Sequence, residues 1–191
     1  MNLSQKLWEN NLYLAEKSLQ TKFVQNLKNG KLPKEKFQIY VAQDAFFLEC
    51  FARAYGLAIS KAKDKNTIKH LSQLLLGVSE ELVLHDSYAK KWGINLDLNK
   101  IELSTKNYTD FLNDVSQKNN LVEIMCAMAP CMRLYAWIGK SIADEYKNNP
   151  YKEWIGTYSD KSFEKLAETL ENLIDCSNQT YEIKNLNLGK K

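Results

Sequence analysis

The chain has 191 residues, enough for one domain with a full hydrophobic core. Its formal net charge of +3 is small and evenly spread, which argues against a nucleic-acid partner. No apolar run approaches the length of a membrane span, and the N-terminus lacks the pattern of a signal peptide, so we expect no membrane partner.

Apolar residues recur with helical spacing along nearly the whole chain. The spacing predicts a first helix or helix pair that ends near Gly30. A second segment runs to about residue 62, with Pro33 suited to its first turn. A third helix is expected between a cap at Asn66 or Thr67 and a stop at Gly93.

A polar stretch, residues 94–107, leads to a predicted helix over residues 108–117, and two asparagines then break the pattern. A long apolar helix follows over residues 121–146. Residues 151–159 are expected to form a short helix or turn, and residues 160–179 the last clear helix. No repeat or linker is visible, so the sequence predicts a single all-α domain over residues 1–191.

Asp44 stands among apolar side chains in the second predicted segment. Glu49 and Arg53, four residues apart, mark the solvent face of that helix, and Asp44 lies about 140° around the axis from Glu49. Asp44 is therefore predicted to point inward. An isolated buried carboxylate costs several kcal/mol or takes up a proton, so it needs a partner. Either a functional or a structural role fits this residue.

Cys131 follows Pro130 inside the long apolar helix. Proline kinks a helix and frees a carbonyl, here that of Cys126, and Tyr135 lies four residues after Cys131 on the same face. A thiol in such a place can act as a nucleophile if a neighbour favours its thiolate, although free cysteines usually just pack. The four cysteines have no CxxC spacing, which is typical of reduced thiols in a cytoplasm and not of a disulfide framework or a zinc site.

Residues 23–62 contain "LPKEKFQIYVAQD", which resembles the L-P-x-x-x-F-x-x-Y-x-x-Q-D signature of the TenA family (thiaminase II, also called aminopyrimidine aminohydrolase). The resemblance continues in "SEELVLHDSYAKKWGI", "NYTDFL", "APCMRLYAWIG" and "PYKEWIGTYSDKSFEKL", in the family's order. It implies a heme-oxygenase-like helical bundle.

The resemblance also implies site residues. Asp44 matches the aspartate that grips the amine and a ring nitrogen of an aminopyrimidine, and Cys131 matches the nucleophile that adds to its ring. In the empty protein we expect Asp44 to bond to water or to a tyrosine hydroxyl such as Tyr108 or Tyr135. Four aromatic residues match the lining of the substrate pocket: Phe47 (where relatives often carry tyrosine), Tyr108, Tyr135 and Tyr158.

The implied reaction is hydrolysis in thiamin salvage, from an aminomethyl-pyrimidine or thiamin to hydroxymethyl-pyrimidine. It needs no metal and no organic cofactor, because the pyrimidine ring itself holds the electrons. Relatives commonly form homo-oligomers, often tetramers, so the resemblance implies such an assembly in the cytoplasm.

One departure from the family concerns the end of the chain. Relatives continue into a further helix with a glutamate that protonates the ring, whereas residues 180–191 resemble only its lead-in, and Glu182 lacks the aromatic neighbours of that acid. The expected bundle therefore lacks the last family helix. The alternative function is a catalytically impaired pyrimidine- or thiamin-binding protein, or an interaction module. A heme-binding relative would need His70 or His85 as axial ligand.

Overall fold

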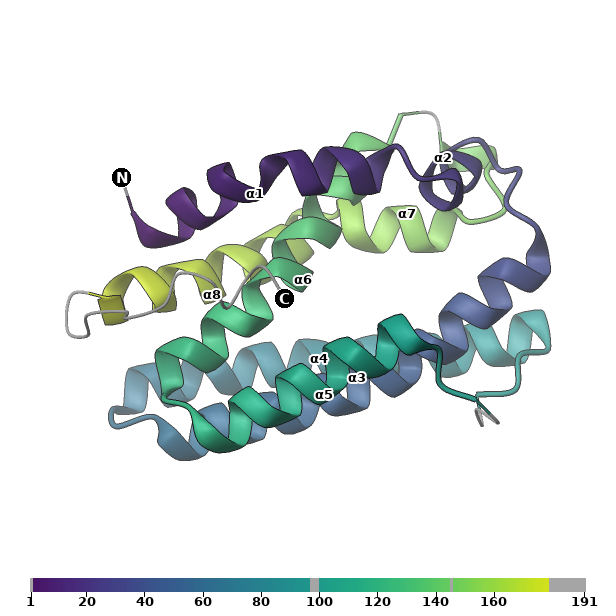
Figure 1. Ribbon diagram of the computed structural model, residues 1–191. Helices are drawn as coiled ribbons and strands as arrows, with labels where there is room; N and C mark the ends of the chain where they lie inside the picture. The colour runs from purple at the N-terminus through teal and green to yellow at the C-terminus, as the bar shows by residue number, and fades with distance from the viewer. Residues whose placement is uncertain (1, 97–99, 145, 179–191) are drawn as a thin grey trace. The chain divides into compact units, whose positions relative to one another are not determined.

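A computed structural model of the chain describes residues 2–96, 100–144 and 146–178. All regular structure in these ranges is helical, which confirms the all-α prediction (Figure 1). The helices are α1 (Leu3–Leu19), α2 (Lys22–Lys28), α3 (Lys34–Lys61), α4 (Lys65–Trp92), α5 (Leu103–Lys118), α6 (Leu121–Ser141), the 3-10 helix η1 (Tyr146–Asn148), α7 (Lys152–Ser159) and α8 (Lys161–Asn178). The predicted lack of a final family helix concerns residues 180–191, which lie outside the described ranges.

Several predicted helix ends are confirmed, and each has a local cause. The hydroxyl of Thr21 accepts a hydrogen bond from the backbone N–H of Val24, which separates α1 from α2. Gly93 ends α4 in the left-handed conformation, at φ 65° and ψ 43°. At the start of α6, Asn120 and Glu123 each accept from the other's backbone N–H at 3.1 Å, so their side chains form a reciprocal cap.

The predicted starts of α3 and α4 were wrong in detail. Pro33 precedes α3 as its extended N-cap, with ψ 137°, and does not stand in the first turn. At α4 the capping side chain is that of Asp64, not of Asn66 or Thr67. Its Oδ1 accepts from the N–H groups of those two residues at 3.0 and 2.9 Å. These hydrogen bonds, above all those from Thr67, lower the pKa of Asp64.

The chain divides into two compact units. Unit 1 consists of the described residues up to Leu32 and those from Ala129 onward, and unit 2 consists of Pro33–Met128. The boundary falls inside α6, one residue before Pro130. The prediction of a single domain over residues 1–191 stays a prediction.

Unit 2 is built on α3, which packs along both α4 and α5 (Figure 1). The three residues between α3 and α4 join them as a helical hairpin. The buried face of α3 is mostly apolar, and Asp44 is its only buried charged residue. Large side chains completely or almost completely shielded from solvent form this core, among them Phe37, Phe51, Tyr55, Leu71, Leu74 and Leu112.

Side chains of α3 also donate hydrogen bonds to backbone carbonyls at the C-terminal ends of α4 and α5. The ammonium of Lys61 donates to the carbonyls of Ser116 at 2.8 Å and Asn119 at 2.6 Å, at the C-terminal end of α5. The amide of Gln38 donates to the carbonyl of Trp92, the last residue of α4, at 2.9 Å. Because the last carbonyls of a helix have no partner within it, these contacts replace water and fix where α4 and α5 end.

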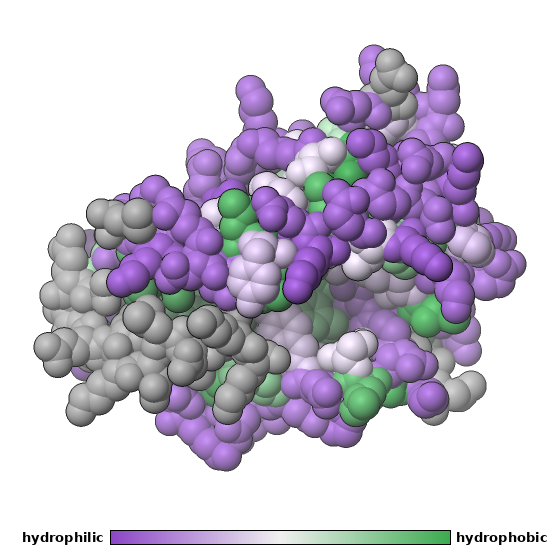
Figure 2. Space-filling model, turned by 45° about the horizontal axis from the view of Figure 1, so that its top comes forward, coloured by the Kyte–Doolittle hydropathy of each residue, from purple (hydrophilic) through white to green (hydrophobic). Residues whose placement is uncertain are grey.

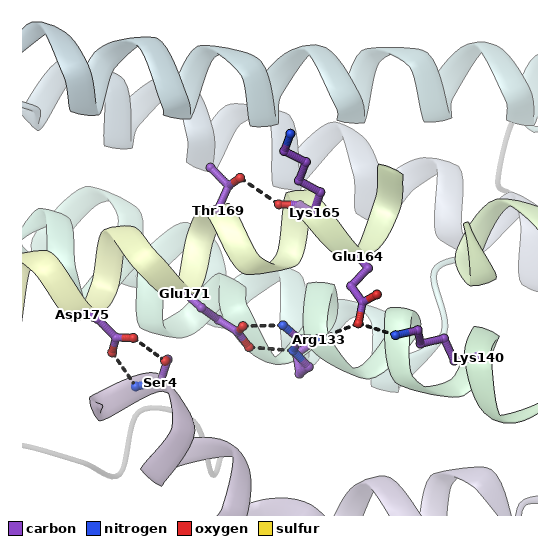
Figure 3. A network of polar contacts seen from close by, with 8 residues as sticks. All are labelled: Ser4, Arg133, Lys140, Glu164, Lys165, Thr169, Glu171 and Asp175. Atoms are coloured by element: carbon purple, nitrogen blue, oxygen red, sulfur yellow. Dashed lines mark hydrogen bonds and ion pairs between the residues drawn. The ribbon is translucent and has the colours of Figure 1, made fainter. Parts of the chain in front are cut away.

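In unit 1 an ion-pair network joins α6 to α8 (Figure 3). The guanidinium of Arg133 forms a two-pronged contact with the carboxylate of Glu171, and Glu164 accepts from Lys140 at 2.5 Å. The hydrogen bond to Glu171 outweighs partial burial and raises the pKa of Arg133 further. Because Arg133 is only 19% exposed and its contact is bidentate, this pair holds the two helices more firmly than a surface pair.

The N-terminus of α1 is capped by another helix. The Asn2 side chain makes no capping bond, whereas the carboxylate of Asp175 in α8 accepts from the backbone N–H of Ser4 at 2.8 Å and from its hydroxyl at 2.7 Å (Figure 3). A carboxylate at this end of a helix also interacts favourably with the helix dipole. Asp175 therefore ties α1 to α8.

Helix α6 corrects the expectation about membrane spans. Within the described residues it is the one helix long and apolar enough to cross a membrane by length and composition, and half of that stretch is buried. The face drawn in Figure 2 is mostly hydrophilic, with hydrophobic residues in small groups. That no membrane is a partner stays a prediction.

Gly139 allows α6 and α7 to approach closely. A Cβ atom at this position would overlap the carbonyl of Tyr158 and lie 2.7 Å from the nitrogen of Ser159. Both are backbone groups, which cannot turn aside as a side chain could. The close contact of the two helices therefore depends on the absence of a side chain at residue 139.

We expect Gly139→Ala to lower the free energy of unfolding by about 1–3 kcal/mol or more, since the added methyl group forces the helices apart. Gly56→Ala is the control: that glycine lies inside α3 with open space around its Cβ position, so alanine should raise stability by about 0.5–1 kcal/mol. Urea unfolding of the three proteins measures both changes. Equal stabilities of Gly139→Ala and the wild type would contradict the close approach.

Asp175→Ala should lower the free energy of unfolding by about 0.5–2 kcal/mol, because Ser4 loses the acceptor for its N–H and its hydroxyl. Lys165→Ala, at an exposed position of the same helix, should stay within about 0.5 kcal/mol of the wild type. Thermal unfolding followed by circular dichroism tests both, and an Asp175 variant as stable as the Lys165 variant would refute the capping role.

Candidate functional site

Asp44 points inward, as the sequence predicts. The residue is 8% exposed, whereas Glu49 and Arg53 lie on the solvent face and pair at 3.0 Å. Asp44 sits near the middle of α3, on a helix that contacts α4 along its length. The carboxylate is therefore held by rigid helical structure away from bulk water.

The partners of Asp44 in unit 2 are His85 and Tyr40. Its Oδ2 atom accepts from His85 Nε2 at 2.9 Å and from the Tyr40 hydroxyl at 3.0 Å. A tyrosine hydroxyl does bind Asp44, as expected, but it is that of Tyr40; the hydroxyl proton of Tyr108 is donated to the Ala127 carbonyl at 3.1 Å. Tyr40 lies one turn before Asp44, a spacing visible in the sequence, whereas His85 comes from α4 and could be found only from the fold.

The hydrogen bonds of His85 define its charge. Nδ1 lies 2.8 Å from the backbone carbonyl of Glu81, and Nε2 faces the Asp44 carboxylate. The Glu81 carbonyl can only accept, so Nδ1 carries a proton, and the carboxylate beside Nε2 favours a second proton there. Burial lowers the pKa of His85, but the hydrogen bond and charge of Asp44, helped by Glu81, outweigh it, so the pKa is raised above 6.5. With both nitrogens used in this way, His85 is a poor candidate for an axial heme ligand.

Aromatic rings lie next to this carboxylate along α3. Phe47, one turn after Asp44, packs on Tyr108 of α5 with ring centroids 5.3 Å apart and planes at 36°, and on Phe51 at 5.3 Å. Tyr108 also stacks near Phe111, at 6.4 Å. Two of the four predicted pocket aromatics, Phe47 and Tyr108, are therefore in contact with each other.

Gln43 places the beginning of α5. Its amide nitrogen donates to the carbonyl of Lys100 at 3.0 Å, and its amide oxygen accepts from the N–H of Glu102 at 3.0 Å. Glu102 is the N-cap residue of α5, the helix that carries Tyr108. The consecutive residues Gln43 and Asp44 thus bind different neighbours of α3. Gln43 binds the beginning of α5, and Asp44 binds His85 of α4.

In unit 1 the predicted residues Cys131, Tyr135 and Tyr158 come from α6 and α7. Cys131 is partly exposed and is four residues before Tyr135 on α6. The rings of Tyr135 and Tyr158 lie 4.8 Å apart, and Trp154 packs on Tyr158 at 4.6 Å. Sequence reasoning left Trp154 open between core, subunit contact and ligand site, and the structure buries it beside these two tyrosines.

The proline in α6 lies at an exposed position immediately before Cys131. Pro130 has no N–H to donate within the helix, and that the carbonyl of Cys126 is thereby freed stays a prediction. The next carbonyl, that of Ala127, accepts the hydroxyl of Tyr108. A side chain of α5 thus binds the backbone of α6 close to the proline.

The remaining predicted features concern the other cysteines and metals. Cys50, Cys126 and Cys176 are free thiols, and burial raises the pKa of Cys50 despite the nearby Arg53. Within residues 2–96, 100–144 and 146–178, no three His, Cys, Asp or Glu residues form a group that could hold a metal ion. Glu182 lies outside the described residues. Asp44 belongs to unit 2 and Cys131 to unit 1, so their predicted pairing across one pocket stays a prediction.

The Asp44–His85 pair predicts how stability depends on pH. A histidine with a raised folded-state pKa stabilises fully below its unfolded value of 6.5, and the contribution is lost as the pH rises through the folded value. We therefore expect the free energy of unfolding to fall as the pH is raised from 6.5. Urea midpoints over this range measure it. His85→Gln should remove the slope, whereas His70→Gln, on the same helix, should keep it; a slope that survives His85→Gln would assign it elsewhere.

Comparison with known proteins gives relatives over most of the chain. An aminopyrimidine aminohydrolase from Halalkalibacterium halodurans is 33% identical over 182 residues, 92% of this chain and 81% of that protein. One from Bacillus subtilis is 30% identical over 169 residues, 85% of this chain and 72% of that protein. The mitochondrial bifunctional TH2 protein of Arabidopsis thaliana is 34% identical over 185 residues; these are 83% of this chain but only 29% of that longer protein.

Solved structures agree in fold. A TenA homologue from Pyrococcus furiosus superposes with a TM-score of 0.89 at 21% identity, over 98% of this chain and 90% of that one. The TenA homologue of P. horikoshii OT3 gives a TM-score of 0.87 at 26% identity, over 100% and 90% of the two chains. The TENA/THI-4/PQQC family matches residues 13–187, and the chain therefore belongs to this family.

Proposed function

We propose that the chain is an aminopyrimidine aminohydrolase of the thiaminase II type, which releases hydroxymethyl-pyrimidine from an aminomethyl-pyrimidine or from thiamin. The observation that carries this proposal is the similarity to three proteins named aminopyrimidine aminohydrolase, at 26–33% identity over 85–92% of the chain. The buried carboxyl group of Asp44 in α3 supports it, because such a group suits the amine edge of a pyrimidine.

Asp44 holds the substrate in this proposal. Its carboxylate accepts hydrogen bonds from the exocyclic amine and from a protonated ring nitrogen, two donors that share one edge of the ring. Phe47 lies one turn further along α3 and packs against Tyr108 of α5. The two rings offer apolar surface on which the pyrimidine can stack. Binding thus combines one charged contact with ring contacts from Phe47, Tyr108, Tyr135 and Tyr158.

Cys131 is the nucleophile. Its thiolate forms a bond to a ring carbon, and the displaced ring electrons move to the ring nitrogens, which take up a proton. These electrons then expel the substituent on the methylene carbon, as ammonia or as the thiazole of thiamin. Water adds to the exocyclic methylene, the C–S bond breaks, and the thiolate is restored. No electrons are gained or lost overall, so the reaction is a hydrolysis.

We also propose a cytoplasmic, homo-oligomeric protein. All four cysteines are free thiols, which suits a reducing compartment. Three large apolar side chains on α4 are exposed, Ile68, Leu76 and Val83 at 39%, 58% and 66%, and a second copy of the chain could cover them.

Replacement of the thiol tests the mechanism. Cys131→Ala should lower turnover by a factor of 10³ or more, roughly what loss of a covalent nucleophile costs, and should leave binding of the aminomethyl-pyrimidine within about threefold. Cys176→Ala, an exposed thiol on α8, is the matched control and should keep full activity. Ammonia release and calorimetric titration measure the two effects.

Full activity in Cys131→Ala would refute the mechanism. A wild-type protein that binds the aminomethyl-pyrimidine but releases no hydroxymethyl-pyrimidine would instead support the alternative, a catalytically impaired pyrimidine-binding protein.

A further inference from the structure

The carboxylate of Asp44 is held by one of its two oxygens. Both His85 and Tyr40 donate to Oδ2, at 2.9 and 3.0 Å. Neither contact involves Oδ1. The protein therefore fixes Oδ2, while the lone pairs of Oδ1 can accept hydrogen bonds from a ligand. A carboxylate held in this way has a defined orientation and a defined acceptor to offer.

His85 is in turn held by its own helix. Its Nδ1–H donates to the carbonyl of Glu81, one turn earlier on α4, at 2.8 Å, and its ring packs against Tyr88 at 5.9 Å. The residue is 2% exposed. With Nδ1 bound to a carbonyl, the Nε2–H bond can point only toward Asp44, as in other sites where a second hydrogen bond orients an imidazole.

We propose that His85 is a positioning residue for substrate binding, which keeps the Asp44 carboxylate oriented so that Oδ1 meets the amine edge of the aminopyrimidine. This inference rests on the proposed function, because it assumes that Asp44 holds that substrate.

The reason lies in the chemistry of a buried acid. A carboxylate as shielded as Asp44 loses its contact with water, and the hydrogen bonds from His85 and Tyr40 replace that contact at Oδ2. An amine needs an acceptor, and a carboxylate oxygen offers one. Because the His85 ring is fixed, Oδ2 stays bound to it, and Oδ1 is the oxygen that binds the substrate.

Titratable groups from two helices lie around this pair. Within the described part of unit 2, Asp44 and Tyr40 of α3 and Glu81 and Tyr88 of α4 lie near His85. Burial opposes the charge on His85, while Asp44 and then Glu81 favour it, and the net effect is a raised pKa. When the charge of His85 changes with pH, its hydrogen bond to the Asp44 carboxylate should be the contact most affected.

A purely structural ion pair is the competing explanation. In that case the pair would join α3 to α4, and its loss would lower stability without a specific effect on ligand affinity. The two explanations differ in how binding depends on residue 85 in proteins that remain folded, and in how it depends on pH.

The first measurement uses the free protein and does not depend on the function. Nitrogen-15 spectra of the two histidines, assigned with His70→Gln, should show His85 protonated at both ring nitrogens at neutral pH. Asp44→Asn should convert His85 to a neutral ring. A neutral His85 in the wild type would overturn the inference.

The second measurement is calorimetric titration with the aminomethyl-pyrimidine. We expect His85→Gln and Asp44→Asn each to weaken binding by about 10- to 100-fold, the usual effect of one charged hydrogen bond. Tyr40→Phe, which removes a neutral donor from the same oxygen, should weaken it by tenfold or less, roughly the effect of a neutral bond. Wild-type affinity should fall over the pH range in which the His85 signal titrates, and His85→Gln should lack this step.

The outcomes separate the two proposals. If Asp44→Asn loses affinity while a folded His85→Gln binds as the wild type does, the positioning role is refuted and the proposed function stands. If Asp44→Asn itself binds as the wild type does, the substrate anchor of the proposed function fails. Where His85→Gln does not fold, the wild-type pH profile decides: affinity unchanged through the titration of His85 overturns the inference.

Discussion

The hydrogen bond between His85 Nε2 and Asp44 Oδ2 has two roles in the structure. It joins the middle of α3 to α4 inside unit 2, and it gives a hydrogen-bond partner to two polar side chains that are almost closed to water. Either residue alone would destabilise the fold, because a buried polar group without a partner is costly. Together they allow the Asp44 carboxylate to lie inside the packed hairpin of α3 and α4, where its position is set by helices and not by a loop.

Consecutive residues on α3 serve different neighbours. Side chains one residue apart on a helix point about 100° apart, so Gln43 reaches the entry to α5 while Asp44 reaches α4. Tyr108, which packs on Phe47, lies on the helix whose beginning Gln43 binds, and Asp44 binds His85 of α4. The positions of these unit 2 residues are therefore set by α3 and by the two helices packed against it.

Sequence reasoning succeeded where the cause was local. The inward direction of Asp44 follows from the opposite face marked by Glu49 and Arg53, and the stop at Gly93 follows from its freedom to adopt positive φ. The Asp64 cap was also local and was missed, because aspartate two residues before Asn66 is as good a cap as the residues chosen. This error changed the start of α4 by about two residues and nothing in the site.

Other features could not be predicted, because their partners are distant in sequence. His85 lies 41 positions from Asp44, and no pattern in the chain links them before α3 and α4 are paired. The need for glycine at residue 139 likewise arises only when α7 lies against it. The family resemblance named Cys131, Tyr135 and Tyr158 by motif, and the structure adds that the two tyrosine rings are neighbours. The family resemblance did not indicate that His85 is the residue that binds the Asp44 carboxylate.

The capping contacts of α3 have a consequence for the order of folding. Because Lys61 binds carbonyls at the C-terminal end of α5, and Gln43 binds the N-cap of α5, both ends of that helix are completed by side chains that precede it in the chain. An isolated helix of 16 residues is marginal in water, so α5 gains much of its stability only on a formed α3. During synthesis α3 leaves the ribosome first, and the groups that α5 requires are already in place when it emerges.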